Sequence, residues 1–266
     1  MMNKTTIVKS LALIMLIACA FSCKKEKVLE EVSKTGNVVL KFAHFVDGNP
    51  VQLDTMIYTN AAGNPYQIND FRYFISDVQF HKSGGTFINI KDCTWAHYVD
   101  NAIPSTLTWN ICDKLPTGTY DYISFCFGIT SLKNLSNTFV NPPESNMAWP
   151  DILGGGYHYM QLDGKWKDSL NQVENFNTHL GIGRVIVGSD TIFVDNSFHV
   201  TLANSGFTLS ASATSEIQIV MNIDSWYKTP FIFDFNYYGQ MIMMNQDAMH
   251  KISANGNDVF MIGYIH

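Results

Sequence analysis

The stretch VVLKFAHFV (residues 38–46) alternates its side chains with a period of two, so that Leu40, Phe42, His44 and Val46 share one face. The same period recurs in TYDYISFCFGI (119–129) and in EIQIVMNI (216–223). Alternation of this kind is typical of strands that pack one face of a sheet on a core and leave the other in water. These segments therefore predict half-buried antiparallel strands.

Six further segments are rich in aromatic and β-branched residues, which favour strands, and they cover residues 71–80, 93–100, 156–162, 190–202, 230–238 and 258–265. The segment 240–252 is the one good helix candidate, since Met241, Met244, Ala248 and Ile252 recur on roughly one side of a helix. The sequence thus predicts an all-β fold, an antiparallel β-sandwich of the Ig-like or jelly-roll-like kind with one or two short helices.

The composition is that of a globular protein with one sizeable core. Of the 266 residues, 46% are hydrophobic and 15% are charged, and the formal net charge is -6. Removal of residues 1–22 takes away Lys4 and Lys9 and lowers this charge by two, to -8. A negative balance argues against nucleic acid as a partner.

The first residues resemble a bacterial lipoprotein signal. Two lysines precede an apolar run from Ile7 to Phe21, and Ala20-Phe21-Ser22-Cys23 matches a lipobox, in which Cys23 becomes the lipid-modified first residue. A transmembrane anchor is disfavoured because the apolar run is shorter than the roughly 20 residues that a span requires. We expect residues 1–22 to be a signal peptide, 23–36 a lipidated cysteine with a charged tether, and 37–266 a single domain. This predicts a lipid-anchored protein of the bacterial cell envelope, on the periplasmic or surface side of the outer membrane.

Three cysteines remain in the mature domain, namely Cys93, Cys112 and Cys126. An oxidising envelope permits one disulfide with one thiol left over. Three buried free cysteines are an equal alternative, and the sequence does not decide which two would pair.

Histidines on apolar faces are the first candidates for a metal site. His44 shares its face with Leu40 and Phe42, and His158 shares its face with Met160 and Leu162, so both are expected to point inward. A buried imidazole needs a partner, and a backbone carbonyl satisfies it as well as a metal does. Trp95 and His97 are two residues apart in an expected strand and therefore share a face, whereas the face of His179 is ambiguous.

Two other features raise questions of their own. The methionines of MIMMNQDAM (241–249) could bind Cu(I) through thioethers, although at helical spacing methionines more often fill a core. Gly154, Gly155 and Gly156 stand beside bulky aromatics, and we expect at least one positive φ or one close backbone contact there, which turns the chain so that His158 points inward.

The usual signatures of catalysis are missing from the sequence. We find no Gly-x-Ser-x-Gly, no Cys-x-x-Cys and no Gly-x-Gly-x-x-Gly after a strand. An acid pair such as Asp163 with Asp151 or Glu174 cannot be told from surface carboxylates. The sequence therefore predicts that the protein is not an enzyme.

Several ordered segments resemble the MbnP-like copper-binding protein family over most of the chain from about residue 37 to 262. They are FAHFVDGNPVQLD (42–54), NDFRYFISDVQF (69–80), LPTGTYDYISFCFGI (115–129), NPPESNMAWPDILGGGYHYMQLDGKW (141–166) and FNTHLGIG (176–183). Their ordered succession, more than any single piece, carries the resemblance.

The resemblance implies an envelope β-sandwich that binds copper, as Cu(I) or Cu(II), through two histidines and a tryptophan oxidised to kynurenine. It puts His44, His158, His97 and His179 on the list of metal ligands, with Trp95 as the kynurenine-forming residue. This chain departs from the family's Trp-x-Trp pattern at Trp149-Pro150-Asp151. A separate haem oxidase is the expected partner for the tryptophan oxidation. The alternative function is a metal-free β-sandwich that recognises a protein or glycan through exposed aromatics.

Overall fold

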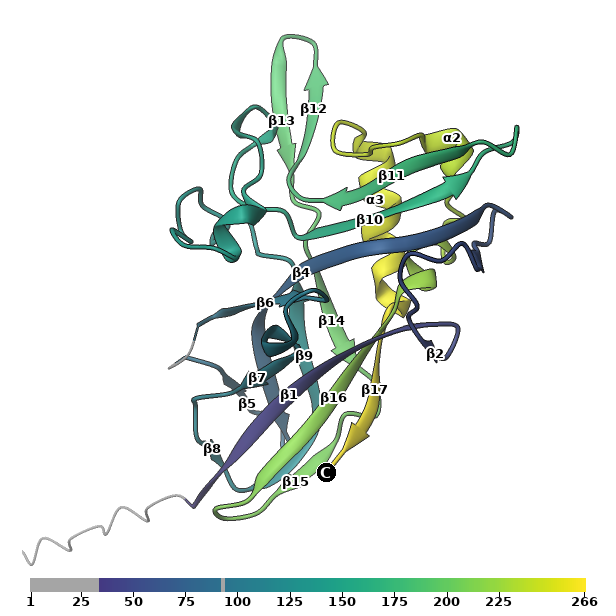
Figure 1. Cartoon of the computed structure of the whole chain (residues 1–266). Coiled ribbons are helices and arrows are strands. Elements are labelled where there is room, and N and C mark those ends of the chain that lie inside the picture. Colours follow the sequence, from purple (N-terminus) through teal and green to yellow (C-terminus); the bar gives the residue numbers. More distant parts are fainter. Residues whose placement is uncertain (1–33, 92–93) are drawn as a thin grey trace, which may run out of the picture. The chain divides into compact units, whose positions relative to one another are not determined.

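The computed structural model describes residues 34–91 and 94–266, which form one compact unit of two packed sheets and a projecting hairpin (Figure 1). The expected signal peptide, the lipidated Cys23 and Cys93 lie outside the described residues. Within the described part of the chain, no helix is long and apolar enough to cross a membrane.

The first sheet is built around the long strand that contains VVLKFAHFV. It has the order β17-β16-β1-β2, with β7 and β8 also pairing with β1. Its strands are β1 (Thr35–Val46), β2 (Asn49–Pro50), β7 (Thr108–Asn110), β8 (Leu115–Pro116), β16 (Thr214–Asn222) and β17 (Phe260–Ile265). Burial alternates strictly along β1, which confirms the period-two prediction.

One pairing in this sheet differs from the expectation. β1 and β16 run parallel, with Leu40 opposite Ile217, so the prediction that both are antiparallel strands is wrong for this pair. Parallel neighbours need a long crossover, and here the chain between them builds the second sheet (Figure 1).

The second sheet has the order β11-β10-β4-β9-β14, with β3, β5 and β6 also pairing with β4 and β15 with β9. Its strands are β3 (Tyr58–Thr59), β4 (Pro65–Lys82), β5 (Phe87–Asn89), β6 (Ala96–Asp100), β9 (Gly118–Phe127), β10 (Met160–Lys167), β11 (Val173–Leu180), β14 (Phe198–Leu202) and β15 (Phe207–Leu209). Strand β4 pairs with β10 through its first half and with β9 through its second half. The register shifts between Ser76 and Gln79, where Asp77 has a φ of 52°, as expected of a β-bulge that bends a strand.

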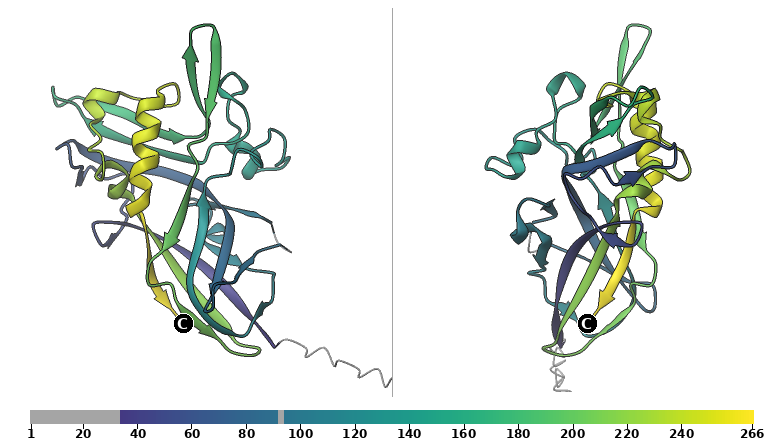
Figure 2. Two further views of the ribbon diagram at one scale, coloured as in Figure 1. Left: turned by 180° about the vertical axis from the view of Figure 1, so that it is seen from behind. Right: turned by 45° about the vertical axis from the view of Figure 1, so that its right-hand side comes forward.

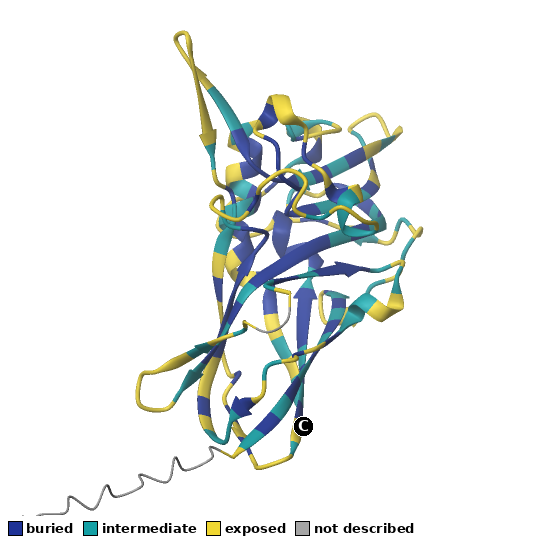
Figure 3. Ribbon diagram, turned by 90° about the vertical axis from the view of Figure 1, so that its left-hand side faces the viewer, coloured by how far each residue is buried: buried dark blue, intermediate teal, exposed yellow. Residues whose placement is uncertain are grey.

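The third sheet is the hairpin of β12 (Gly183–Val187) and β13 (Asp190–Val194), whose residues are mostly exposed (Figures 1 and 3). The expected strand 190–202 is broken between β13 and β14. Asp195 Oδ1 accepts a hydrogen bond from Ser197 N at 2.9 Å, and this local turn competes with strand pairing.

Two short α-helices lie within the described residues, as predicted, together with five short 3₁₀ helices. They are η1 (Pro104–Leu107), η2 (Glu144–Met147), η3 (Asp151–Leu153), η4 (Ile223–Tyr227), α2 (Phe235–Tyr238), α3 (Gln246–Asn255) and η5 (Gly256–Asp258). The expected helix 240–252 is wrong at its start, because the side chain of Asn245 accepts from Ala248 N and caps α3 there. The expected strand 230–238 is also wrong, since Asp234 caps α2 in the same way.

An aromatic core joins the layers, so the prediction of a mostly antiparallel sandwich is confirmed. Phe127 of β9 lies at its centre, with its ring 5.0 Å from Trp226, 5.4 Å from Phe260 and 5.1 Å from Phe198. Figure 2 shows α3 lying across β10 and β11 at one end of the molecule. That end also carries the segment with the three consecutive glycines.

The cysteines resolve one alternative. Cys112 is disulfide-bonded, whereas Cys126 is a free thiol buried in β9. Three free cysteines are therefore excluded.

Candidate metal centre

The backbone before β10 folds back on itself and buries His158. Trp149 N donates to Gly156 O at 2.8 Å, and His158 N donates to Met147 O at 2.7 Å. β10 begins only at Met160, so the expected strand 156–162 is wrong for its first residues. The predicted inward position of His158 is nevertheless confirmed, since its side chain is buried.

The three glycines make this turn possible. Gly154, Gly155 and Gly156 have φ values of 117°, 68° and 79°, a region that residues with a Cβ rarely adopt. A Cβ at Gly155 would lie 2.7 Å from Ser136 Oγ, and one at Gly156 would lie 2.6 Å from Asn134. Both parts of the glycine prediction, positive φ and close approach, are confirmed.

His158 is held as a neutral imidazole with a defined tautomer. Its Nδ1 lies 3.0 Å from the carbonyl of Met147, and a carbonyl can only accept, so Nδ1 carries the proton and Nε2 keeps its lone pair. Burial is the main cause that lowers the pKa of His158 to about 4. A neutral imidazole with a free lone pair is the form that binds a metal.

His179 of β11 lies directly beside it. The two ring centroids are 5.1 Å apart and the rings are nearly perpendicular, at 84°. His179 Nε2 is 2.9 Å from Asp163 Oδ1 of β10, so the carboxylate accepts the Nε2 proton. His179 Nδ1 then has a lone pair, and this buried atom has no hydrogen-bond partner.

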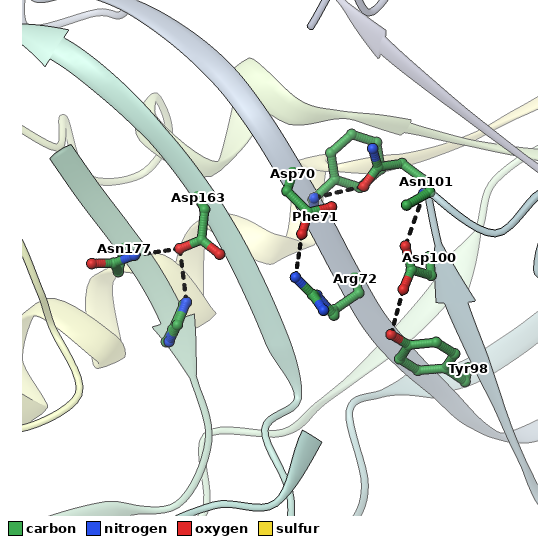
Figure 4. A network of polar contacts seen from close by, with 10 residues as sticks. Asp70, Phe71, Arg72, Tyr98, Asp100, Asn101, Asp163 and Asn177 are labelled. Carbon is green, nitrogen blue, oxygen red and sulfur yellow. Dashed lines mark hydrogen bonds and ion pairs between the residues drawn. The ribbon is translucent and has the colours of Figure 1, made fainter. Parts of the chain in front are cut away.

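Asp163 is itself held by two side chains. Its Oδ1 also accepts a hydrogen bond from the side chain of Asn177, its register partner on β11 (Figure 4). Burial raises the pKa of the Asp163 carboxyl, but the hydrogen bonds from His179 and Asn177 are among the interactions that outweigh it, so the pKa lies below its usual value. On the other side β10 pairs with β4, where Asp70 forms an ion pair with Arg72.

Trp149 packs on His158. Its ring centroid lies 4.7 Å from that of His158 at 81°, and its Nε1 donates to Leu153 O at 3.3 Å. A Cβ at Gly181 would lie 2.7 Å from the indole, so the glycine two residues after His179 lets the tryptophan approach.

The other predicted site residues have different partners. His44 is buried in β1, as predicted, with Nε2 3.0 Å from Tyr73 Oη, and burial lowers its pKa to about 3. His97 stacks on Trp109 with ring centroids 4.7 Å apart, and its Nε2 donates to Thr106 O at 2.8 Å. Trp95 stacks on Phe139 at 5.9 Å. Of the four shortlisted histidines, the ring contacts within the described residues join only His158 to His179.

The arrangement is therefore a pair of imidazoles backed by a carboxylate. Two imidazoles that bind one ion at about 2 Å per bond have centroids roughly 5 to 6 Å apart, and the separation of the two rings lies in this range. A carboxylate on the far nitrogen of a ligating histidine is the usual support of such ligands. In residues 34–91 and 94–266, no group of three or more His, Cys, Asp and Glu side chains is placed to hold an ion.

Sequence reasoning missed Asp163 and Trp149 as members of this site. A signal for His179 was present, because Phe176, Thr178 and Leu180 of β11 are buried in alternation and leave His179 on the other face with Asn177. Recognition of β10 and β11 as a hairpin would have brought Asp163 beside it.

Comparison with known proteins agrees with this architecture. A structure of MbnP from Methylosinus trichosporium superposes with a TM-score of 0.50 at 17% identity, over 75% of this chain and 80% of that one, which is a likeness of fold. A search of curated proteins gave no match. The sequence model of the MbnP family matches residues 35–246, most of the chain. The chain therefore belongs to the MbnP family.

Proposed function

We propose that the protein is an envelope lipoprotein that binds copper through His158 and His179, for copper capture or handling. One observation carries the assignment. The buried Nδ1 of His179 has no protein partner although its Nε2 is saturated by Asp163, and it belongs to a ring 5.1 Å from that of His158. A bound cation would satisfy this atom, whose isolation otherwise costs about 1–3 kcal/mol.

Copper suits this donor set better than other common ions. Among divalent first-row metals copper binds nitrogen donors most tightly. Structural zinc takes four ligands, and the described residues offer no cluster of three or more suitable side chains. When bound, copper would supply a cationic centre to both imidazoles. Met147 and Asp163 would hold the ring protons away from it.

The same geometry bears on tryptophan oxidation. The family resemblance implies a kynurenine, formed by a separate haem oxidase, and Trp95 was the sequence candidate. Trp149 packs on His158, whereas Trp95 packs on Phe139. We therefore assign Trp149 as the first candidate for oxidation, and intact-mass analysis with peptide mapping identifies the modified residue.

Metal analysis together with matched histidine variants tests the proposal. Protein purified from its native envelope is expected to contain about one copper, measured by inductively coupled plasma mass spectrometry. His158→Ala and His179→Ala should each lower copper affinity about tenfold or more, which corresponds to about 1.4 kcal/mol. His199→Ala, an exposed position on β14, is the control and should bind like the wild type.

Two results would contradict the proposal. Absence of copper from the native protein and from titrated wild type would leave the metal-free binding module as the function. Equal copper affinity in wild type, His158→Ala and His179→Ala would place the copper elsewhere.

A further inference from the structure

Three methionines just before α3 line a hollow on the surface. Met241 and Met244 are 59% and 74% exposed, and Met243 is partly buried. The hollow has a volume of about 270 Å³, and its other walls are Pro150, Ile152, Leu153 and Arg184. Methionine side chains are usually buried, so two widely exposed ones beside a third call for an explanation.

Core packing accounts for Met243 in part, since it packs against the core, but not for Met241 and Met244. The prediction that the methionines of residues 241–249 fill a core is right for Met249 and wrong for Met241 and Met244, which lie before the start of α3 at Gln246. The core-facing positions of α3 are Ala248, Met249 and Ile252. The three methionines thus remain outside the helix, on a segment that runs beside β11.

Backbone contacts with β11 link this segment to His179. Asn177 N donates to Gln240 O at 2.7 Å, and Asn177 forms an isolated parallel β-bridge with Met241. The side chain of Asn177 binds the same Asp163 oxygen that holds His179.

A second set of contacts links the hollow to the other histidine. Leu153 lines the hollow, and its carbonyl accepts the hydrogen bond of the Trp149 indole, which packs on His158. The hollow is therefore linked to His179 through Asn177 and Asp163, and to His158 through Trp149.

We propose that Met241, Met243 and Met244 form a thioether site for Cu(I), distinct from the histidine pair, from which Cu(I) passes to His158 and His179. Thioether sulfurs are soft, uncharged donors that select Cu(I) over harder cations. The transfer changes no oxidation state, because the ion exchanges sulfur for imidazole nitrogen and remains Cu(I). Only the transfer depends on the proposed function, and the thioether site stands by itself.

Arg184 sets the strength of this site. Its side chain lines the hollow, and a guanidinium repels a second cation at close range. Weak retention suits a site that hands its ion on to an uncharged pair. Replacement of Arg184 by Gln should therefore tighten the binding of a monovalent soft cation.

The test uses Ag(I), a redox-inert analogue of Cu(I), with full-length protein that carries ¹³C-methyl methionine. Addition of Ag(I) should shift the methyl resonances of Met241, Met243 and Met244. Met261 of β17 is a matched control, since it is 48% exposed but lies in the other sheet, and its resonance should not move. Equal shifts of Met261 and the three methionines, or no shift of the three, would overturn the proposal.

Two variants separate this site from the histidine pair. The triple Met→Leu variant at 241, 243 and 244 keeps the apolar volume and should lose one bound Ag(I) while the histidine pair still binds. The double variant His158→Ala, His179→Ala should keep the methionine shifts. Loss of those shifts in the double variant would show that the thioethers form no site of their own and would refute the proposal. An unchanged rate of Cu(I) uptake by the histidine pair in the triple variant would refute the transfer step.

Discussion

Asp163→Asn isolates the carboxylate behind the metal pair with little change in volume. In the wild type, Asp163 Oδ1 accepts from both His179 Nε2, at 2.9 Å, and the Asn177 side chain. An asparagine keeps one oxygen acceptor but removes the negative charge, and its NH₂ group can face His179 only by reversing the tautomer that frees Nδ1. Loss of a supporting carboxylate typically costs 10–100-fold in metal affinity, and tenfold is about 1.4 kcal/mol.

We therefore expect Asp163→Asn to weaken Cu(I) binding about tenfold, measured by competition with a chromophoric Cu(I) chelator at neutral pH. The variant should also be less stable at neutral pH. Because the pKa of Asp163 is depressed in the folded protein, its stabilisation is present above the unfolded value of 3.8 and is lost as the pH falls through the folded value.

Asp190→Asn, an exposed carboxylate on β13, is the matched control and should change neither quantity. Cu(I) affinity of Asp163→Asn within twofold of the wild type would refute the role of the carboxylate. A loss of stability without a loss of affinity would make Asp163 a structural residue only.

Two further predictions concern the backbone turn and the buried histidine of β1. Gly156→Val should lower the melting temperature, because φ is 79° and the new Cβ would meet Asn134 at 2.6 Å. Gly188→Val is the control: this glycine of the exposed hairpin also has a positive φ but has open space around it, so the variant measures the cost of positive φ alone. Equal losses of melting temperature in the two variants would contradict the steric part of the explanation. His44→Phe should flatten the pH dependence of stability between pH 6.5 and about 3, because in that window the unfolded wild type takes up a proton at His44 and the folded protein does not. In the wild type this proton uptake lowers the free energy of unfolding by up to about 1.4 kcal/mol per pH unit as the pH falls. An unchanged slope in denaturant melts across that window would show that His44 is protonated in the folded protein.

Local pattern was enough to predict β1 and most of β16 as strands with one buried face. β9 was correctly predicted as a strand, but the prediction that it is half-buried is wrong, because both faces are buried from Ile123 to Phe127. The unusual backbone at residues 154–156 was also predictable from the sequence. The inward position of His44 followed from the neighbours with which it alternates. His158 is buried as predicted, but it lies in the turn before β10, where Tyr157 and Tyr159 are buried as well. In β1 the decisive pattern lies within a few residues of each position.

Pairings between distant segments could not be predicted in this way. The parallel alignment of β1 with β16 depends on how the intervening chain folds. The Asp163–His179 contact depends on the register of β10 with β11, where Asp163 faces Asn177 and His179 faces Gln161. Side chains of adjacent strands on one face meet only when this register is known.

The predicted start of the helix was wrong for a different reason. Spacing alone placed Met241 and Met244 on a helical face, but the side chain of Asn245 satisfies a backbone N–H of the first turn of α3 and fixes its start there. Met241 and Met244 therefore precede the helix and are exposed at the surface. Capping chemistry, read from the sequence, would have favoured this boundary.

The most direct test of the central claim is nuclear magnetic resonance of the histidine ring nitrogens in ¹⁵N-labelled protein, with and without one equivalent of Cu(I). We predict that the resonances of His158 Nε2 and His179 Nδ1 shift to metal-bound values. His158 Nδ1 and His179 Nε2 should remain protonated, with their protons donated to Met147 O and Asp163 Oδ1. The ring nitrogens of His44 and His97 should not change. Cu(I)-induced shifts at His44 or His97 without shifts at His158 and His179 would contradict the assignment of the copper site.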